Sequence, residues 1–169
     1  MDKYSILKQY YGHSAFRAGQ EELIDSILSG RDALCVMPTG GGKSLCYQIP
    51  ALLLPGITLV VSPLISLMKD QVAALKSAGV PAAYINSSLT SEQIRTVYAR
   101  TRKGAYKLIY VAPERLETNS VLSLMQEMDV SFLAVDEAHC ISQWGQAFRP
   151  SYLGIVDFIY ALPRSPLVA

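Results

Sequence analysis

The stretch Met37-Pro38-Thr39-Gly40-Gly41-Gly42-Lys43-Ser44 decides the fold that we expect for this chain of 169 residues. It follows the apolar run Ala33–Val36 and precedes a segment with a helical pattern that begins near Lys43. A strand, a glycine-rich turn and a helix start together form a cradle of backbone N–H groups. The positive end of the helix dipole also faces that cradle. The stretch therefore predicts a phosphate-binding loop.

The individual residues of this loop suggest what it binds. Gly40, Gly41 and Gly42 allow a tight backbone turn. Lys43 can reach the β- and γ-phosphates of a nucleotide, and the Ser44 hydroxyl can hold Mg²⁺. Met37 stands where the strict pattern has a glycine, so only the second half of the pattern is strict. We predict a site for a nucleoside triphosphate; the alternative is a chance glycine turn before a helix.

Short apolar runs alternate with helical patterns along the chain. The strands that we predict are at 33–37, 57–62, 82–85, 107–111 and 131–136, with a further strand opening at 167–169. The predicted helices cover 44–54, 64–77, 91–102 and 119–128, and another helical face lies at 23–28. Several strands are apolar throughout, which is typical of parallel strands covered on both sides. The pattern predicts one α/β domain with a mainly parallel sheet and helices on both faces.

Composition excludes several classes of protein. With 50% hydrophobic and 17% charged residues, the chain is not expected to be disordered. Its net charge of +1 gives no overall cationic signal for nucleic acid. Cys35, Cys46 and Cys140 lack metal-ligand spacing, and we expect reduced, buried thiols. We find neither a signal peptide nor an apolar run of membrane-spanning length.

A second motif, Asp136-Glu137-Ala138-His139, follows the apolar run Phe132–Val135. In an open α/β sheet, ligands bind at the carboxyl ends of the strands, where the glycine loop also lies. Asp136 can hold Mg²⁺, partly through water, and Glu137 can orient or activate an attacking water. The alternative is a solvated acidic turn.

The two motifs together resemble superfamily 2 helicases. Further stretches are similar to the RecQ family of DNA helicases, over about residues 11–153: FRAGQ at 16–20, SLCYQIPAL at 44–52, VVSPLISLMKDQ at 60–71, YVAPERL at 110–116 and DEAHCISQWG at 136–145. The DEAH motif alone would also suit an RNA helicase. The run at 140–149 is what favours RecQ.

The resemblance implies a P-loop NTPase domain of the RecA-like type. Residues 1–169 would be the first RecA-like helicase domain, with N-terminal helices and an adenine-recognition motif in 1–30. The sequence would be a fragment that lacks the second RecA-like domain, which supplies an arginine to the ATP site. The implied activity is ATP-dependent 3′–5′ unwinding in DNA repair or recombination. The implied location is cytoplasmic, at the nucleoid in bacteria or in the nucleus in eukaryotes.

The implied cofactors are ATP and Mg²⁺, and the implied partner is single-stranded or duplex DNA. We expect the fragment alone to lack efficient turnover. The alternatives are a superfamily 2 translocase or RNA helicase motor, and a non-catalytic nucleotide-binding module.

Residues of the nucleotide site can be assigned from the resemblance. Gln20, with Arg17 nearby, matches the adenine-recognition motif, and an amide can pair with the edge of adenine. His13 stands where the family usually has an aromatic ring that stacks on the base, and a plain turn residue is an open alternative. The loop residues Thr39, Gly40, Gly41, Gly42, Lys43 and Ser44 would hold the phosphates.

Further residues match stretches that contact DNA in the family. Ser62, Lys69 and Arg115 would contact the backbone of single-stranded DNA. The alternative is that these are ordinary turns at strand ends, with Ser62 capping a helix. His139 would couple the nucleotide site to DNA, and a structural histidine is the alternative.

An aromatic-rich loop follows the second motif. Bases can stack on Trp144 and Phe148, while Gln143 and Arg149 add polar contacts. The alternative is that the rings only anchor the loop to the core. Family members commonly have an acidic residue where this chain has Ala147, and its loss would weaken the coupling of DNA binding to hydrolysis.

Overall fold

The computed structural model describes residues 1–38, 40–138, 149–162 and 165–169, with the backbone alone at 149–154. Within this part of the chain, five strands form one sheet in the order β2-β3-β1-β4-β5, and every pairing is parallel. The strands are β1 (Ile57–Val61), β2 (Ala82–Ile85), β3 (Leu108–Val111), β4 (Val130–Val135) and β5 (Leu167–Val168).

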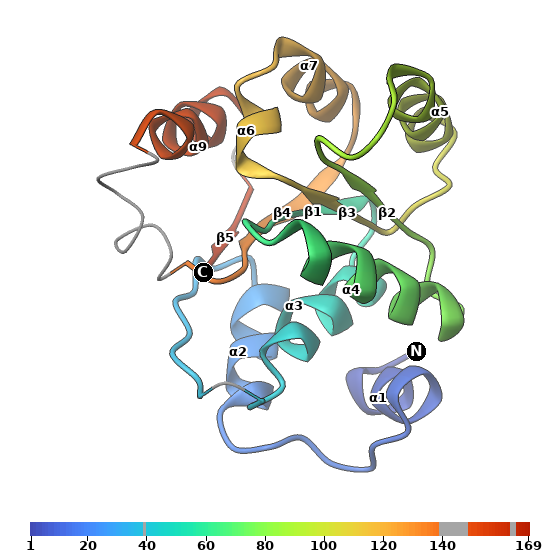
Figure 1. Ribbon diagram of the computed structural model, residues 1–169. Helices are drawn as coiled ribbons and strands as arrows, with labels where there is room; N and C mark the ends of the chain where they lie inside the picture. The colour runs from blue at the N-terminus through green and yellow to red at the C-terminus, as the bar shows by residue number, and fades with distance from the viewer. Residues whose placement is uncertain (39, 139–148, 163–164) are drawn as a thin grey trace.

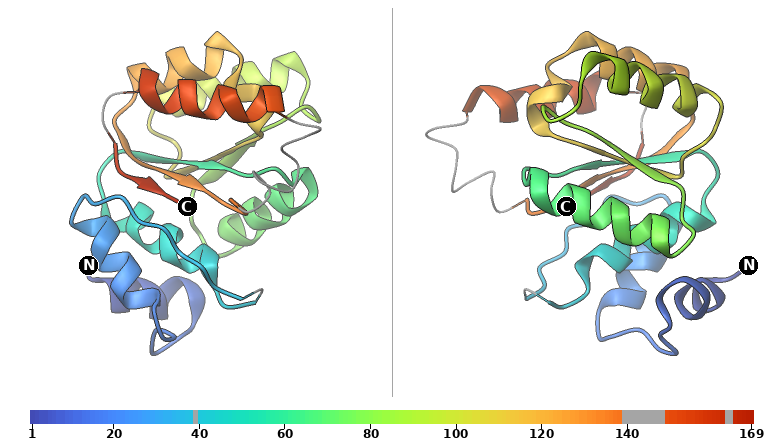
Figure 2. Two further views of the ribbon diagram at one scale, coloured as in Figure 1. Left: turned by 90° about the vertical axis from the view of Figure 1, so that its left-hand side faces the viewer. Right: turned by 45° about the vertical axis from the view of Figure 1, so that its right-hand side comes forward.

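Helices cover both faces of the sheet (Figures 1 and 2). On one face lie α2 (Gln20–Leu28), α3 (Lys43–Leu53) and α4 (Ile65–Ser77), and α1 (Lys3–Tyr11) packs outside them. On the other face lie α5 (Ser91–Arg102), α6 (Pro113–Leu116), α7 (Asn119–Glu127) and α9 (Arg149–Ala161). This three-layer arrangement confirms the predicted α/β fold with a parallel sheet.

Successive residues of each strand point to opposite layers, as the pleat of a strand requires. In β1, Val60 packs toward α3 and α4, whereas Leu59 and Val61 pack toward α7 and α9. All five residues of β1 are buried. Burial on both faces explains why the strands read as unbroken apolar runs.

The predicted strand at 33–37 is wrong in extent. Only Ala33 forms a bridge, to Val168, and the hydrogen bonding continues no further than Cys35 N, which donates to the carbonyl of Ala169. Leu34 and Val36 are exposed at 77% and 92%. An apolar run of this length predicts a buried strand, but here the segment pairs, among the described residues, only with residues 167–169, and its other edge faces away from the sheet. The other predicted strands and helices form within three residues of their expected ends; the largest difference is at α2, which begins at Gln20 where the helical face was expected from residue 23.

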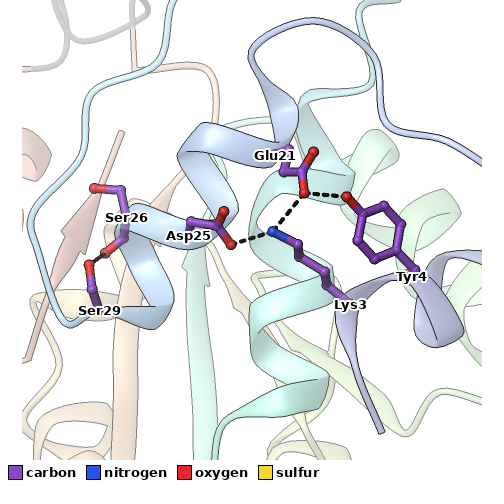
Figure 3. Close-up of polar contacts among 6 residues, drawn as sticks. All are labelled: Lys3, Tyr4, Glu21, Asp25, Ser26 and Ser29. Atoms are coloured by element: carbon purple, nitrogen blue, oxygen red, sulfur yellow. Dashed lines mark hydrogen bonds and ion pairs between the residues drawn. The ribbon is translucent and has the colours of Figure 1, made fainter.

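Polar contacts join α1 to α2 at the molecular surface (Figure 3). The Lys3 ammonium lies 2.8 Å from Glu21 and 2.6 Å from Asp25, and the Tyr4 hydroxyl donates to Glu21. Below these contacts, Ile6 and Leu7 of α1 are buried in a small apolar cluster shared with α2 and α3. These contacts fix the position of α2, which begins at Gln20.

We predict that Leu59→Ala lowers the free energy of unfolding by about 2–5 kcal/mol, because it empties space at the centre of the sheet. Leu59 has no exposed surface. Val156→Ala on the exposed side of α9, where Val156 is 48% exposed, serves as the control and should cost less than about 0.5 kcal/mol. Urea unfolding of the 169-residue chain measures both, and equal effects would contradict the packing described above.

Candidate functional site

The carboxyl ends of the central strands meet the start of α3 at one edge of the sheet. The backbone N–H of Asp136, directly after β4, donates to the carbonyl of Val61 at the end of β1 at 2.8 Å. Gly42 is the N-cap of α3 with φ of 80°, and no side chain of the described residues caps this helix end. The Leu45 N–H donates back to the carbonyl of Gly42 at 3.2 Å. The N–H groups of Lys43 and Ser44 precede it at the start of α3, where an anion can approach the positive end of the helix.

Lys43 and the acidic pair lie side by side at this edge. The Lys43 Nζ is 3.5 Å from the Glu137 Oε1. Glu137 has φ of 55°, a left-handed conformation that is uncommon for a residue with a side chain, and its N–H donates to Asp136 Oδ1 at 3.0 Å. Backbone strain of this kind is found at functional sites.

Asp136 is a nearly buried carboxylate, 9% exposed. The Tyr47 hydroxyl donates to its Oδ2 at 3.1 Å. Burial raises the pKa of Asp136 above its ordinary value, and the hydrogen bond from Tyr47 acts against that rise. A carboxylate desolvated in this way is stabilised by a nearby cation. Together with the Ser44 hydroxyl, it offers the hard oxygen donors that Mg²⁺ prefers.

The residues of the predicted adenine motif hold the glycine loop. Gln20, 1% exposed, donates from Nε2 to the carbonyl of Gly42 at 3.0 Å and to that of Gly41 at 3.4 Å. Its Oε1 accepts from the N–H of Arg17 at 2.8 Å, and Arg17 Nη1 donates to the carbonyl of Gly40 at 2.7 Å. Sequence reasoning predicted a contact with the base and missed this contact with the loop.

A cavity of about 370 Å³ opens between the glycine loop and the ends of β4 and β5. Lys43, Asp136 and Glu137 line its polar side, and Leu23, Met37 and Val168 belong to its apolar side. Cys35 and Cys46 also line this cavity as free thiols, and burial raises the pKa of both. This agrees with the packing role expected for them.

Other predicted nucleotide contacts lie farther out or outside the described residues. His13 is exposed after the end of α1. Thr39 lies outside the part of the chain that the structure describes, and so does Cys140, for which a buried thiol is expected.

The residues matched to DNA contacts differ in exposure. Ser62 is buried, and the N-cap of α4 is Leu64, so Ser62 does not cap that helix. Lys69 is exposed on α4. Arg115 is half-buried; its Nη2 donates to the carbonyl of Asn86 at 3.4 Å, and its Nε has no partner among the described residues.

Most residues predicted to couple the nucleotide site to DNA or to stack on bases fall between β4 and α9. His139, Gln143, Trp144 and Phe148 lie outside the described residues, and so does Ala147. Arg149 begins α9, but only its backbone is described.

Sequence reasoning also missed four polar side chains close to the site: Tyr47, Gln48, Gln71 and Tyr110. They form hydrogen bonds with one another and with Ser44 and Asp136. The signal that could have found them is a polar group inside an otherwise apolar segment. Gln48 stands in LCYQIPALL and Tyr110 in LIYV.

Residues 17–167 match the family model of the DEAD/DEAH box helicases. This match covers most of the chain, and the chain therefore belongs to the DEAD/DEAH box helicase family. Among the described residues, no helix combines the length and apolarity needed to cross a membrane.

The RecQ resemblance is confirmed at the level of sequence. The chain is 53% identical over 165 residues to the ATP-dependent DNA helicase RecQ of Haemophilus influenzae, which covers 98% of this chain and 27% of that protein. The RecQ of Bacillus subtilis is 51% identical over 165 residues, covering 97% of this chain and 28% of that protein. The chain thus spans little more than a quarter of the length of these relatives.

Solved structures of lower identity share the fold. A hypothetical ATP-dependent RNA helicase from Sulfolobus tokodaii superposes with a TM-score of 0.72 at 20% identity, over 99% of this chain and 50% of that one. The helicase MrfA, bound to DNA and AMPPNP, superposes with a TM-score of 0.73 at 17% identity, over 99% of this chain and 25% of that one. Together with the family match, they confirm the RecA-like helicase fold.

We predict that Gly42→Ala weakens binding of a fluorescent ATP analogue by about tenfold or more, corresponding to at least about 1.4 kcal/mol. A Cβ at Gly42 would lie 2.5 Å from Gln20 Nε2, and the residue has φ of 80°. Gly79→Ala is the matched control, because Gly79 has φ of 84° and a methyl group added there would meet no atom within 4 Å. Both changes should cost about 1–2 kcal/mol of stability. Equal binding by both variants would disprove the role of this contact.

Proposed function

We propose that residues 1–169 form the first RecA-like motor domain of a RecQ-type, ATP-dependent 3′–5′ DNA helicase, with the adenine-recognition motif in 1–30. The observation that carries this proposal is the meeting of Lys43, Asp136 and Glu137 at the carboxyl edge of a parallel sheet, beside the open N-terminus of α3. High sequence identity to RecQ proteins supports the choice of family member.

The chain's own groups would bind the triphosphate of ATP. The N–H groups at the start of α3 and the Lys43 ammonium offer positive charge to the phosphates. A triphosphate would compete with Glu137 for Lys43, since the ion pair measures 3.5 Å and both side chains are partly exposed. Gln20 and Arg17 connect the predicted adenine site to the carbonyls of the loop.

Ser44 and Asp136 would hold Mg²⁺, directly or through water. When bound, Mg²⁺ would neutralise charge on the phosphate oxygens. The donor set fits this ion, because both side chains present oxygen atoms and Asp136 is oriented by Tyr47. Glu137, adjacent to Asp136 and directed toward Lys43, would orient the attacking water and accept its proton.

Movement along DNA requires more than this chain. A second RecA-like domain would supply the arginine that stabilises the transition state, and such an arginine is worth about 10³–10⁵ in rate in related NTPases. Lys69 and Arg115 would contact the phosphates of single-stranded DNA, with affinity and little sequence preference. The full-length protein would thereby unwind duplexes in DNA repair or recombination.

Substitutions in the full-length protein test the catalytic assignment. We predict that Lys43→Ala and Glu137→Gln each lower DNA-stimulated ATP hydrolysis by about a hundredfold or more, because each removes a group that acts on the phosphates or on the water. Glu137→Gln should still bind the ATP analogue. Lys103→Ala, on the exposed end of α5, is the control. Unchanged ATP hydrolysis in the Lys43→Ala protein would contradict the catalytic assignment and favour a non-catalytic nucleotide-binding module.

The nucleic-acid substrate requires a separate measurement. We predict that single-stranded DNA stimulates ATP hydrolysis by the full-length protein more strongly than RNA of the same sequence does. Stronger stimulation by RNA would favour an RNA helicase motor, and stimulation without strand separation would favour a translocase.

We also predict that the 169-residue chain hydrolyses ATP at least about a thousandfold more slowly than the full-length protein, because it lacks the second domain's arginine.

A further inference from the structure

A partly buried chain of hydrogen bonds connects the two side chains that would hold Mg²⁺. We call it the polar relay; it consists of Ser44, Gln71, Gln48, Tyr110, Tyr47 and Asp136. Its members come from α3, from α4, from β3 and from the end of β4. The relay therefore crosses between elements that the sheet alone does not hold together.

One arm of the polar relay leads to Ser44. Gln48 Nε2 donates to Gln71 Oε1 at 3.0 Å, and Gln71 Nε2 donates to Ser44 Oγ at 3.0 Å. Because Gln71 donates, the Ser44 oxygen is an acceptor in this bond. The bond fixes the side on which the Ser44 oxygen can present a remaining lone pair to a cation.

The other arm leads to Asp136. Gln48 Nε2 also donates to the Tyr110 hydroxyl at 3.0 Å, and the Tyr47 hydroxyl donates to Asp136 Oδ2 at 3.1 Å. The two hydroxyls of Tyr110 and Tyr47 are 3.4 Å apart. Since the Tyr47 proton goes to Asp136, Tyr110 is the donor between the two rings. In both arms, each group donates to the next one along, starting at the Gln48 amide and ending at Ser44 in one arm and at Asp136 in the other.

The middle of the polar relay is enclosed by the core, whereas Gln71 and Ser44 at one end are half-buried. Tyr110 has no exposed surface, Tyr47 is 5% exposed and Gln48 is 4% exposed. Burial raises the pKa of Tyr110 to about 12, so its hydroxyl stays protonated and able to donate. Hydrogen bonds that share donors in a low-dielectric interior strengthen one another, and an unpaired member is costly. The arrangement therefore favours one orientation of each side chain.

The arms also reach the segments matched to DNA contacts. Gln71 lies on α4, two positions after the exposed Lys69. Tyr110 lies in β3, and α6 with Arg115 begins two residues after that strand ends. A side-chain contact whose donor and acceptor are about 3.6 Å apart is no longer a hydrogen bond. A small displacement of α4 would therefore lengthen or break the hydrogen bond from Gln71 to the Ser44 oxygen.

We propose that Gln71 and Tyr110 are positioning residues: through the polar relay they orient Ser44 and Asp136 toward Mg²⁺ and link that orientation to the placement of α4 and β3. This inference rests on the proposed nucleotide site. Neither residue would touch the nucleotide itself. Their effect would appear in the Mg²⁺ dependence of nucleotide binding more than in nucleotide binding without the metal.

The test uses the full-length protein and a fluorescent, non-hydrolysable ATP analogue titrated with Mg²⁺. We expect Gln71→Met and Tyr110→Phe each to raise the half-saturating Mg²⁺ concentration by about tenfold or more, the range seen when outer partners of metal ligands are removed. Analogue binding in EDTA should stay within about twofold of wild type. The matched controls are Gln126→Met and Tyr98→Phe, which remove an amide bonded to Ala161 and a hydroxyl bonded to Ser120.

A second background separates positioning from general damage to the fold. If Gln71 acts through Ser44, Gln71→Met should shift the half-saturating Mg²⁺ concentration by less than about twofold in a Ser44→Ala protein. An equal shift in both backgrounds, or a shift no larger than that of Gln126→Met, would overturn the proposal. If Tyr110→Phe fails to fold, Gln71→Met decides the matter, because Gln71 is only half-buried. A wild-type protein that binds no analogue would instead overturn the proposed function.

Discussion

The backbone N–H of Asp136 donates to the carbonyl of Val61, and this bond joins the end of β4 to the end of β1. Because β1 and β4 run in parallel, the residues that follow them come out on the same edge of the sheet. The start of α3 faces that edge. The separation of 3.5 Å between Lys43 and Glu137, the cavity beside them and the orientation of Asp136 by Tyr47 all depend on this register. A shift by one residue would reverse which side chains face the site.

Several polar groups at this edge of the sheet already have partners inside the protein. Lys43 is paired with Glu137, while Gln20 and Arg17 donate to carbonyls of the glycine loop. Such contacts hold a glycine-rich segment whose backbone would otherwise be free to move. A triphosphate bound as proposed would compete with Glu137 for Lys43, and its effect would extend to the end of β4 through Glu137 and to α2 through the loop contacts of Gln20.

The sequence predicted those parts of the site that follow from local pattern and from one rule of topology. Glycines before Lys43 indicated a phosphate cradle, and an apolar run before Asp136 placed that carboxylate at the same edge. The strand at 33–37 was wrong in extent because periodicity and apolarity do not reveal how many strand edges find partners. Gln71 and Tyr110 were missed because a pattern shows which face of an element is buried, whereas hydrogen bonds between α4, α3 and β3 depend on packing between distant segments.

The polar relay is not needed to fill the space between α3, α4 and the sheet. Apolar side chains of similar volume can pack a core at little or no loss of stability, since buried polar groups gain only about 0.5–1.5 kcal/mol from each hydrogen bond. Apolar packing is non-directional, so it would not fix the orientation of a carboxylate or a hydroxyl as a hydrogen bond does. Tyr47 fixes the rotation of the Asp136 carboxylate, and Gln71 fixes the acceptor side of Ser44. At the proposed Mg²⁺ site these orientations would matter, because the cation would bind two oxygens from different elements, and the relay connects those two oxygens.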